Sequence, residues 1–243
     1  MNKKNGIYTS VAMIITLLLS SCIAELFGVT GTGDVVTKNF TLTGFQSVTL
    51  NSAANVEIIK GDKFNVELSD YENLLQYQSV TVSNHTLLIS KEPASTQLNN
   101  SKAKVTITMP DSLIRVTLNG SGNMTISSAF KDLLSTDIFG SGNINAAQWL
   151  EISKLNASIY GSGNITATGK VDSLKAIIAG SGNIDFTTLK ANYANCIISG
   201  SGNINVAVAY NLKATLSGSG NVYYYGHPNV NATMSGSGTV IKK

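Results

Sequence analysis

The sequence contains few of the residues on which most enzymes, disulfide-rich proteins and nucleic-acid-binding proteins depend. Its 243 residues include only 2 Cys, 2 His, 3 Pro and 1 Trp, and 13% of them are charged. Arg115 is the single arginine, and no acidic residue follows Asp185. Two cysteines exclude a framework of several disulfides. Because no cluster of Lys and Arg is present, we expect no nucleic-acid partner.

The N-terminus has the pattern of a bacterial lipoprotein signal. Lys3 and Lys4 give a basic start, residues 11–19 are mostly apolar, and small residues precede Cys22. The apolar run is too short for a spanning helix. We expect residues 1–21 to be removed, and Cys22 to carry a lipid that anchors the protein in the cell envelope, at the outer membrane. An ordinary signal peptide with an accidental cysteine is the alternative.

The remaining chain is nearly neutral and has the composition of β structure. Without Lys3 and Lys4, 15 basic residues stand against 14 acidic ones. The chain is 43% hydrophobic and contains 22 Gly, with Val, Ile and Thr throughout. β-Branched residues favour strands over helices. If Cys22 is lipidated, Cys196 has no partner within the chain for a disulfide.

A Gly-Ser-Gly string recurs seven times at steps of 18 to 21 residues, which indicates an internal repeat. Asn follows the first six copies, and Thr239 follows the last. The first glycines are Gly120, Gly140, Gly161, Gly180, Gly200, Gly218 and Gly236. The asparagines are Asn123, Asn143, Asn164, Asn183, Asn203 and Asn221.

Side chains alternate around each string, as in a strand with one buried face. The residue two positions before the first glycine is always large and aliphatic. The residue four positions before that glycine is nearly always small, and the residue six positions before it is aliphatic or Ala. A large aliphatic residue also follows the Asn, or Thr239, after each string. Each repeat therefore predicts a strand, a tight corner and a second strand. The six-before column is Ile114, Leu134, Leu155, Leu174, Ala194, Leu212 and Val230.

A repeat of about 20 residues cannot bury its own apolar face, so successive copies must stack. Stacking like positions gives an all-β fold, a parallel β-helix or β-solenoid, that advances about 4.8 Å per coil. We expect right-handed winding because β crossovers strongly prefer that hand. The 18-residue steps leave left-handed winding open.

The N-terminal part contains a degenerate copy of the repeat. Residues 48–58, "VTLNSAANVEI", align with 116–126, "VTLNGSGNMTI", and share their inward positions. We expect residues 22–33 to form a tether and 34–243 one β-solenoid domain, with irregular coils over 34–111 and regular repeats over 112–243. A separate N-terminal β domain ending near Pro110 is the alternative.

These motifs resemble a known family. Repeated G-S-G-N-I strings behind a lipoprotein signal, with a degenerate copy upstream, are similar to the putative auto-transporter adhesin, head GIN domain family. The resemblance covers about residues 37–241. It implies a secreted or envelope β-solenoid, and it carries over no catalytic residue.

The glycine string itself matches no known ligand-binding loop. A phosphate-binding loop needs a lysine that reaches the phosphates and a helix after it, and this string has neither. Calcium-binding β-rolls need an acidic residue in each turn, where this corner has neutral Asn. The structural interpretation accounts for the whole string: Gly takes positive φ and lets neighbouring backbones approach closely, and Asn tolerates the left-handed region, hydrogen-bonds locally and can stack into an amide ladder. We expect no cofactor and no metal.

Catalytic residues are not evident, so we expect a protein that is not an enzyme. Hydrolysis of polysaccharides needs paired carboxylates, and the acids of the repeat region fall in different columns. His85 and His227 lie in apparent turns, and Cys196 stands in the column of small inward residues. A carbohydrate-active β-helix, either a lyase or a hydrolase, and a purely structural spacer remain as alternatives.

Exposed aromatic side chains are the remaining candidates for partner binding. Alternation turns Phe139 and Tyr160 outward in one column beside the corner, and turns Tyr223 and Tyr225 outward with Tyr224 inward. Outward aromatics can stack on a glycan or anchor a protein partner. They can also be covered by a loop or by a homo-oligomer. The favoured hypothesis is a non-enzymatic envelope lipoprotein whose β-solenoid presents a surface for adhesion or binding.

Overall fold

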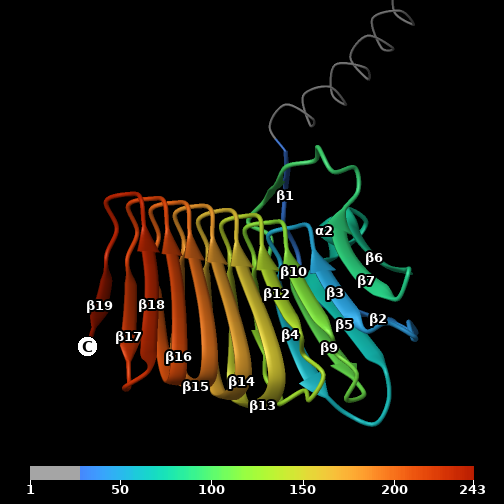
Figure 1. Ribbon diagram of the computed structural model, residues 1–243. Coiled ribbons are helices and arrows are strands. Elements are labelled where there is room, and N and C mark those ends of the chain that lie inside the picture. Colours follow the sequence, from blue (N-terminus) through green and yellow to red (C-terminus); the bar gives the residue numbers. More distant parts are fainter. Residues whose placement is uncertain (1–27) are drawn as a thin grey trace, which may run out of the picture.

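The computed structural model describes residues 28–243 and forms one elongated stack of strands (Figure 1). The tight corners line one edge of the stack, and wide bends line the opposite edge. The strands of the repeats are β10 (Arg115–Leu118), β11 (Asn123–Ile126), β12 (Ser135–Ile138), β13 (Asn143–Ile159), β14 (Asn164–Ile178), β15 (Asn183–Ile198), β16 (Ile204–Leu216), β17 (Val222–Tyr225), β18 (Asn229–Met234) and β19 (Val240–Lys242). The predicted β-solenoid with coils of about 20 residues is confirmed.

Two facing layers make up the stack. Layer A contains the strands that lead into each corner, such as β10, β12 and the last residues of β13. Layer B contains the strands that leave each corner, such as β11 and the first residues of β13. Neighbouring coils pair in parallel and in register, with Ile144 opposite Ile165 in layer B and Ile159 opposite Ile178 in layer A. From β13 to β16, one continuous strand runs through the bend from layer B to layer A.

The degenerate N-terminal copy stacks as its sequence predicts. Strands β3 (Ser47–Leu50) and β4 (Asn55–Lys60) pair in parallel with β10 and β11. Val48 stands opposite Val116, and Asn55 stands opposite Asn123. Ser52-Ala53-Ala54-Asn55 therefore occupies the place of a Gly-Ser-Gly-Asn corner.

The order of the first coils in space differs from their order in the chain. β7 (Thr86–Lys91) pairs with β3, and β9 (Lys104–Met109) pairs with β4, both in parallel. Residues 86–109 thus lie on the outer side of residues 47–60, although they follow them in sequence. One buried hydrophobic cluster nevertheless runs from Phe45 to Val222 through both parts of the chain.

Antiparallel strands cover the N-terminal end of the stack. β2 (Val35–Phe40) and β9 both pair antiparallel with β5 (Asn65–Tyr71), and β6 (Gln78–Ser83) pairs antiparallel with β7. This pairing satisfies backbone groups that an open parallel edge would leave free. The short helix α2 (Glu72–Leu75) and the two-stranded pair β1 (Val29–Thr30) and β8 (Leu98–Asn99) complete this end.

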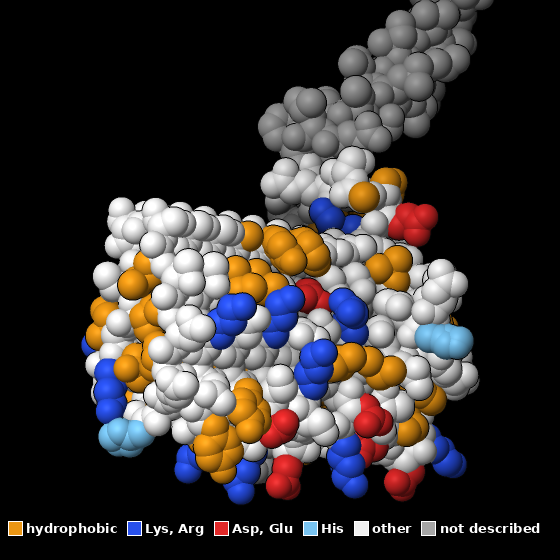
Figure 2. Space-filling view, in the orientation of Figure 1, with side chains coloured by type: hydrophobic (Ala, Val, Ile, Leu, Met, Phe, Trp, Pro, Cys, Tyr) orange, Lys and Arg blue, Asp and Glu red, His pale blue; other side chains and the backbone are white. Residues whose placement is uncertain are grey.

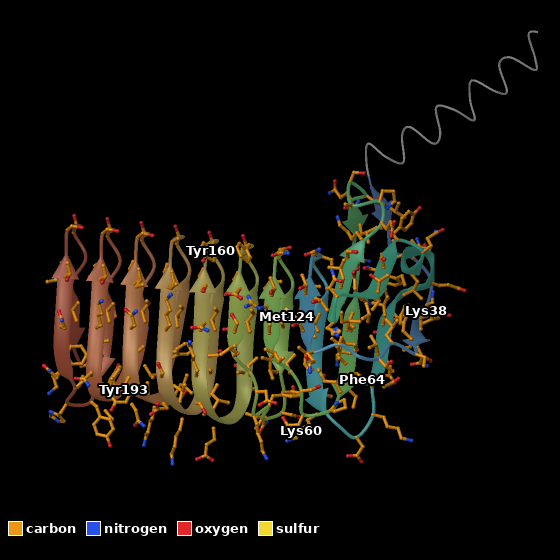
Figure 3. All side chains as sticks on the ribbon, turned by 45° about the vertical axis from the view of Figure 1, so that its right-hand side comes forward. Lys38, Lys60, Phe64, Met124, Tyr160 and Tyr193 are labelled. Atoms are coloured by element: carbon orange, nitrogen blue, oxygen red, sulfur yellow. The ribbon has the colours of Figure 1, made fainter. Side chains whose placement is uncertain are left out.

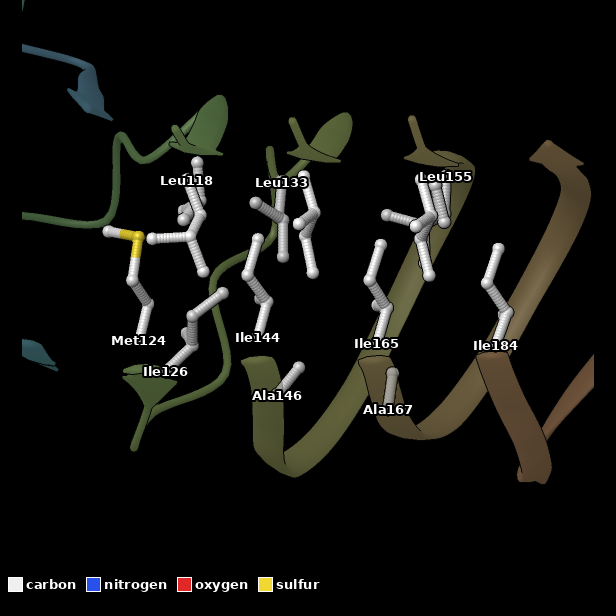
Figure 4. Packing of buried hydrophobic residues seen from close by; sticks show 14 of the residues in the cluster. Leu118, Met124, Ile126, Leu133, Ile144, Ala146, Leu155, Ile165, Ala167 and Ile184 are labelled. Atoms are coloured by element: carbon white, nitrogen blue, oxygen red, sulfur yellow. The ribbon is translucent and has the colours of Figure 1, made fainter. Parts of the chain in front are cut away.

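The core lies between the two layers and consists of several columns of mostly aliphatic side chains, with side chains from the two layers facing each other (Figure 4). In the two-before column, Leu118, Ile138, Ile159, Ile178, Ile198 and Leu216 are each at most 1% exposed. Met234, in the last coil, is 51% exposed, because no described coil stacks beyond it to cover its inner face. The expectation of burial therefore holds for the interior coils and fails at the last.

The prediction that the residue six positions before the first glycine points inward is wrong in the first two coils. Leu134 is 39% exposed and Ile114 is half-buried, whereas Leu113 and Leu133 are buried in their place. The reason is that β10 begins only at Arg115 and β12 only at Ser135. Residues before those starts lie in loops, where strand alternation does not set which side chain faces inward.

Candidate functional site

The corner glycines permit close backbone approach, and they do not adopt left-handed φ. A Cβ atom on any of the 14 glycines of the Gly-Ser-Gly strings would lie 1.6 to 2.1 Å from a carbonyl oxygen of the preceding coil. None of these glycines has a positive φ, a conformation that the described glycines adopt only at Gly28, Gly33, Gly44, Gly169 and Gly226. The expected role of positive φ is therefore wrong for the corners, and the role of close approach is right.

The corner asparagines form a ladder of side-chain amides along the stack. Asn123 donates to Asn55 at 3.0 Å, Asn143 to Asn123 at 2.9 Å, and Asn164 to Asn143 at 2.8 Å. The ladder continues with Asn183, Asn203 and Asn221, and it ends at the Thr239 hydroxyl, which donates to Asn221 at 2.8 Å. None of these residues is among the described non-glycine residues with positive φ. The amide oxygens are occupied within the stack, so the corners offer little to a ligand.

Replacing Asn164 with alanine is expected to destabilise the protein by about 1–2 kcal/mol, since three hydrogen bonds of the ladder disappear. The Nδ2–H that reaches Asn143 is lost, and so is the oxygen that accepts from the backbone and side chain of Asn183. Urea unfolding measures the change. Ser162→Ala, in the exposed position of the same corner, is the control. Equal stability of the two variants would contradict a structural role for the ladder.

Phe139 and Tyr160 form an exposed stacked pair on the outer face of layer A. Their ring centroids are 4.8 Å apart, and the ring planes differ by 6°. Phe139 is 53% exposed and Tyr160 is 48% exposed. Figure 3 places Tyr160 close to the corner edge, and in Figure 2 this edge is a white band over the repeats with hydrophobic side chains beside it.

A polar cluster lies next to this pair on the same face. The Asp137 carboxylate accepts from the Arg115 guanidinium at 2.9 Å and from the Ser135 hydroxyl at 2.8 Å. Asp137 is 8% exposed as a residue, whereas the Arg115 side chain is 54% exposed. Hence the aromatic pair stands beside a fixed ion pair whose guanidinium still faces solvent.

The other two predicted aromatics lie elsewhere. Tyr223 is on β17 in layer B, half-buried, with the Lys243 ammonium 4.9 Å from its ring centroid. Tyr225 is 40% exposed at the bend edge. The four predicted aromatics therefore do not form one surface. Tyr224 packs against the core, as alternation predicts.

A second exposed aromatic pair was not evident from the sequence. Tyr193 and Tyr210 are 45% and 59% exposed, with ring centroids 5.8 Å apart. Both belong to the bends, and Tyr193 is labelled at that edge in Figure 3. Register shifts occur there between β15 and β16, so an alignment on the corner glycines does not bring the two tyrosines together.

A groove of about 670 Å³ runs along the bend edge, and we call it the bend groove. It is lined by Glu151, Ile152, Lys170, Val171, Asp172, Lys190, Ala191, Asn192, Ala207, Val208, Ala209, Tyr225 and Gly226. Glu151 and Asp172 occupy different columns, as expected, but the fold brings both to this one groove. Both carboxylates are exposed, and Asp172 accepts from the Asn192 amide at 2.9 Å.

The thiol of Cys196 and the two histidines lie in surroundings that suit structural roles. Cys196 is fully buried, and burial raises the pKa of its thiol to about 12, which suits a small core residue. His85 lies with Asn84 in the left-handed turn between β6 and β7, and His227 contacts the Lys242 ammonium at 3.0 Å. Cys22 lies outside the described residues.

Residues 28–243 contain neither a metal-binding cluster nor a membrane-spanning helix. No group of three or more His, Cys, Asp or Glu side chains is placed to hold a metal ion. No helix in this part of the chain is long and apolar enough to span a membrane.

Comparison with known proteins places the chain in a family. The model of the family described as putative auto-transporter adhesin, head GIN domain, matches residues 44–228, which is most of the chain. The chain belongs to this family. No curated protein matches the sequence.

Solved structures share the fold. A putative adhesin from Bacteroides fragilis is 24% identical, with a TM-score of 0.80 over 89% of this chain and 100% of that one. A putative adhesin from Parabacteroides merdae is 25% identical, with a TM-score of 0.73 over 88% and 98%. A putative lipid binding protein from Parabacteroides distasonis is 25% identical, with a TM-score of 0.74 over 88% and 99%. The head GIN family thus accounts for the repeats and the stacked coils.

Proposed function

We propose that the protein is a non-enzymatic scaffold of the cell envelope that binds a glycan or protein partner through side chains on the outer faces of its coils. Family membership supports an adhesion-like role. The corner residues support this role indirectly. Their close backbone contacts and their side-chain amides hold successive coils together, so they are not available to bind a partner. Binding then depends on the few large side chains that the stack leaves exposed.

The stacked pair Phe139–Tyr160 carries this proposal. One face of the Tyr160 ring lies against Phe139. The next coil along the stack has Ala179 in the same column, where the backbone N–H of Ala179 donates to Ile159. Because a methyl group fills little space, the second face of the Tyr160 ring is open to a partner. Aromatic stacking contributes about 0.5–1.5 kcal/mol beyond burial.

The test measures binding of the full-length chain to a glycan panel and to intact cells. We expect the double variant Phe139→Ser/Tyr160→Ser to lose about tenfold or more in affinity for a neutral glycan or a protein target that the wild-type protein binds, which corresponds to about 1.4 kcal/mol. Both side chains are exposed, so the melting temperature should stay unchanged.

The matched control is Tyr193→Ser/Tyr210→Ser, which removes the other exposed aromatic pair at the opposite edge. It should bind as the wild-type protein does. Equal losses in both double variants, or no loss in the first, would refute a specific role of the Phe139–Tyr160 pair.

We also propose that Cys22 anchors the scaffold by a lipid at the outer membrane. The basic start, the apolar run and the position of Cys22 support this. Metabolic labelling with a radioactive fatty acid should mark the wild-type chain and not Cys22→Ala. Label that persists in the variant would remove the anchor from the proposal.

One observation favours a second candidate, a carbohydrate-active enzyme. Glu151 and Asp172 both line the bend groove, and glycosidases place two carboxylates on either side of the scissile bond. Against it, the general acid of such enzymes usually lies in an apolar pocket, and both carboxylates are exposed. A purely structural spacer would bind nothing in either test.

A further inference from the structure

The bend groove follows one row of side chains along the stack. In register, Glu151 stands opposite Lys170, Lys170 opposite Lys190, Lys190 opposite Ala207, and Ala207 opposite Tyr225. At about 4.8 Å per coil, these four steps cover roughly 19 Å. The groove therefore runs across the strands and extends over several coils.

The floor of the groove is aliphatic. Ile152, Val171, Ala191 and Val208 stand in register one residue after that row. Each belongs to the buried core and is at most 7% exposed, so the floor offers little side-chain surface of its own. Polar and charged side chains form the rim above this floor. An apolar concave surface with a few convergent polar groups is the usual form of a small-molecule or oligosaccharide site.

Two lysines of the rim take part in none of the ion pairs found among residues 28–243. Lys170 and Lys190 are direct register partners on adjacent coils. Like charges placed opposite one another destabilise a sheet. The three ion pairs among residues 28–243 include neither lysine, and Asp172 is hydrogen-bonded by Asn192. Glu151 is the register partner of Lys170 on its other side, and the two side chains form no ion pair. An anion between the two ammonium groups would relieve their repulsion.

Tyr225 provides an aromatic surface at the end of the same row. Its side chain is 40% exposed, and the residue after it is Gly226, which has a φ of +102° and no side chain to cover the ring. Sugar rings present apolar C–H faces that pack against aromatic rings. An acyl chain would instead favour an apolar tunnel with charge at one end, whereas here the lysines lie in the middle of the row.

We propose that the bend groove binds an extended acidic oligosaccharide. An acidic group of the sugar chain lies between Lys170 and Lys190, one ring stacks on Tyr225, and the rest of the sugar chain lies along the groove between the exposed side chains of its rim. This site is separate from the Phe139–Tyr160 pair, so either binding surface can fail without the other.

The test is isothermal titration calorimetry of the full-length chain. The probes are tetragalacturonate, a chondroitin sulfate tetrasaccharide, neutral maltotetraose and octanoate. We expect at least one acidic tetrasaccharide to bind about tenfold or more tightly than maltotetraose, and its affinity to fall as salt is raised. Lys170→Gln/Lys190→Gln should lose about tenfold in affinity. Tyr225→Ala should weaken binding, and Tyr225→Phe should retain it because the ring face remains.

The matched control is Lys175→Gln/Lys213→Gln, which removes the same charge from exposed positions on the outer face of layer A. It should bind as the wild-type protein does, and so should Phe139→Ser/Tyr160→Ser. The proposal is overturned if neither acidic probe binds, if maltotetraose binds equally well, if the control lysines matter equally, or if octanoate displaces the acidic probe.

Discussion

Gly182→Val is expected to destabilise the protein by about 3 kcal/mol or more. A Cβ atom at this position would lie 1.8 Å from the carbonyl oxygen of Gly163 in the preceding coil. Because that oxygen belongs to a stacked backbone, it can move away only by separating two coils. At roughly 2–4 °C per kcal/mol for a chain of this size, the melting temperature should fall by at least about 6 °C.

Two further variants separate the possible reasons for glycine at this position. If glycine served a left-handed φ, asparagine would be tolerated better than alanine. If it serves close approach, Gly182→Ala and Gly182→Asn should both be strongly destabilising. Ser181→Ala, at the exposed neighbour, is the control. An unchanged melting temperature in Gly182→Val would refute the stacked corner.

Ile165→Ala is expected to cost about 2–5 kcal/mol, because it opens a cavity in the column between the layers. Ile165 is 1% exposed and stacks in register between Ile144 and Ile184. Neighbouring coils are rigidly paired on both sides, so they cannot collapse into the space. Thermal unfolding followed by circular dichroism measures the loss.

Thr166→Ala is the matched control in the next position of the same strand, where the side chain is exposed. It loses only a hydroxyl bond of 2.9 Å to Asn145. We expect a change below about 1 kcal/mol. Comparable losses at Ile165 and Thr166 would contradict the inward and outward assignment of this strand.

The regular part of the fold was predictable because equivalent residues of successive repeats must stack on one another in neighbouring coils. Stacking equivalent residues fixed the register, including the alignment of Val48 with Val116 over a corner that lacks glycine. The amide ladder follows from the same rule, since residues in one column are about 4.8 Å apart.

The irregular part required long-range information. No repeat identifies residues 86–109 as the coil on the far side of residues 47–60, and their placement depends on pairing across the whole N-terminal part. Leu133 replaces Leu134 in the core because alternation begins only with β12. Glycine is favoured both where φ is positive and where two backbones approach closely. The sequence alone therefore could not tell which of these two reasons applies at the corners.

A candidate site was predictable from the sequence where its residues occupy equivalent positions of successive repeats. Phe139 and Tyr160 stand in equivalent positions, and alternation turned both outward. The bend groove combines residues from bends of unequal length, between which the register shifts. Lys170, Lys190 and Tyr225 therefore come together only in the folded stack.

The proposal that the protein binds glycans without cleaving them is tested most directly by measuring the mass of each glycan after binding. The full-length chain is incubated with the glycan panel, and bound and unbound sugars are then analysed by mass spectrometry. A non-enzymatic scaffold predicts at least one bound glycan, recovered at its original mass after prolonged incubation. Shortened or unsaturated products that disappear in Glu151→Gln or Asp172→Asn would contradict it and establish an enzyme.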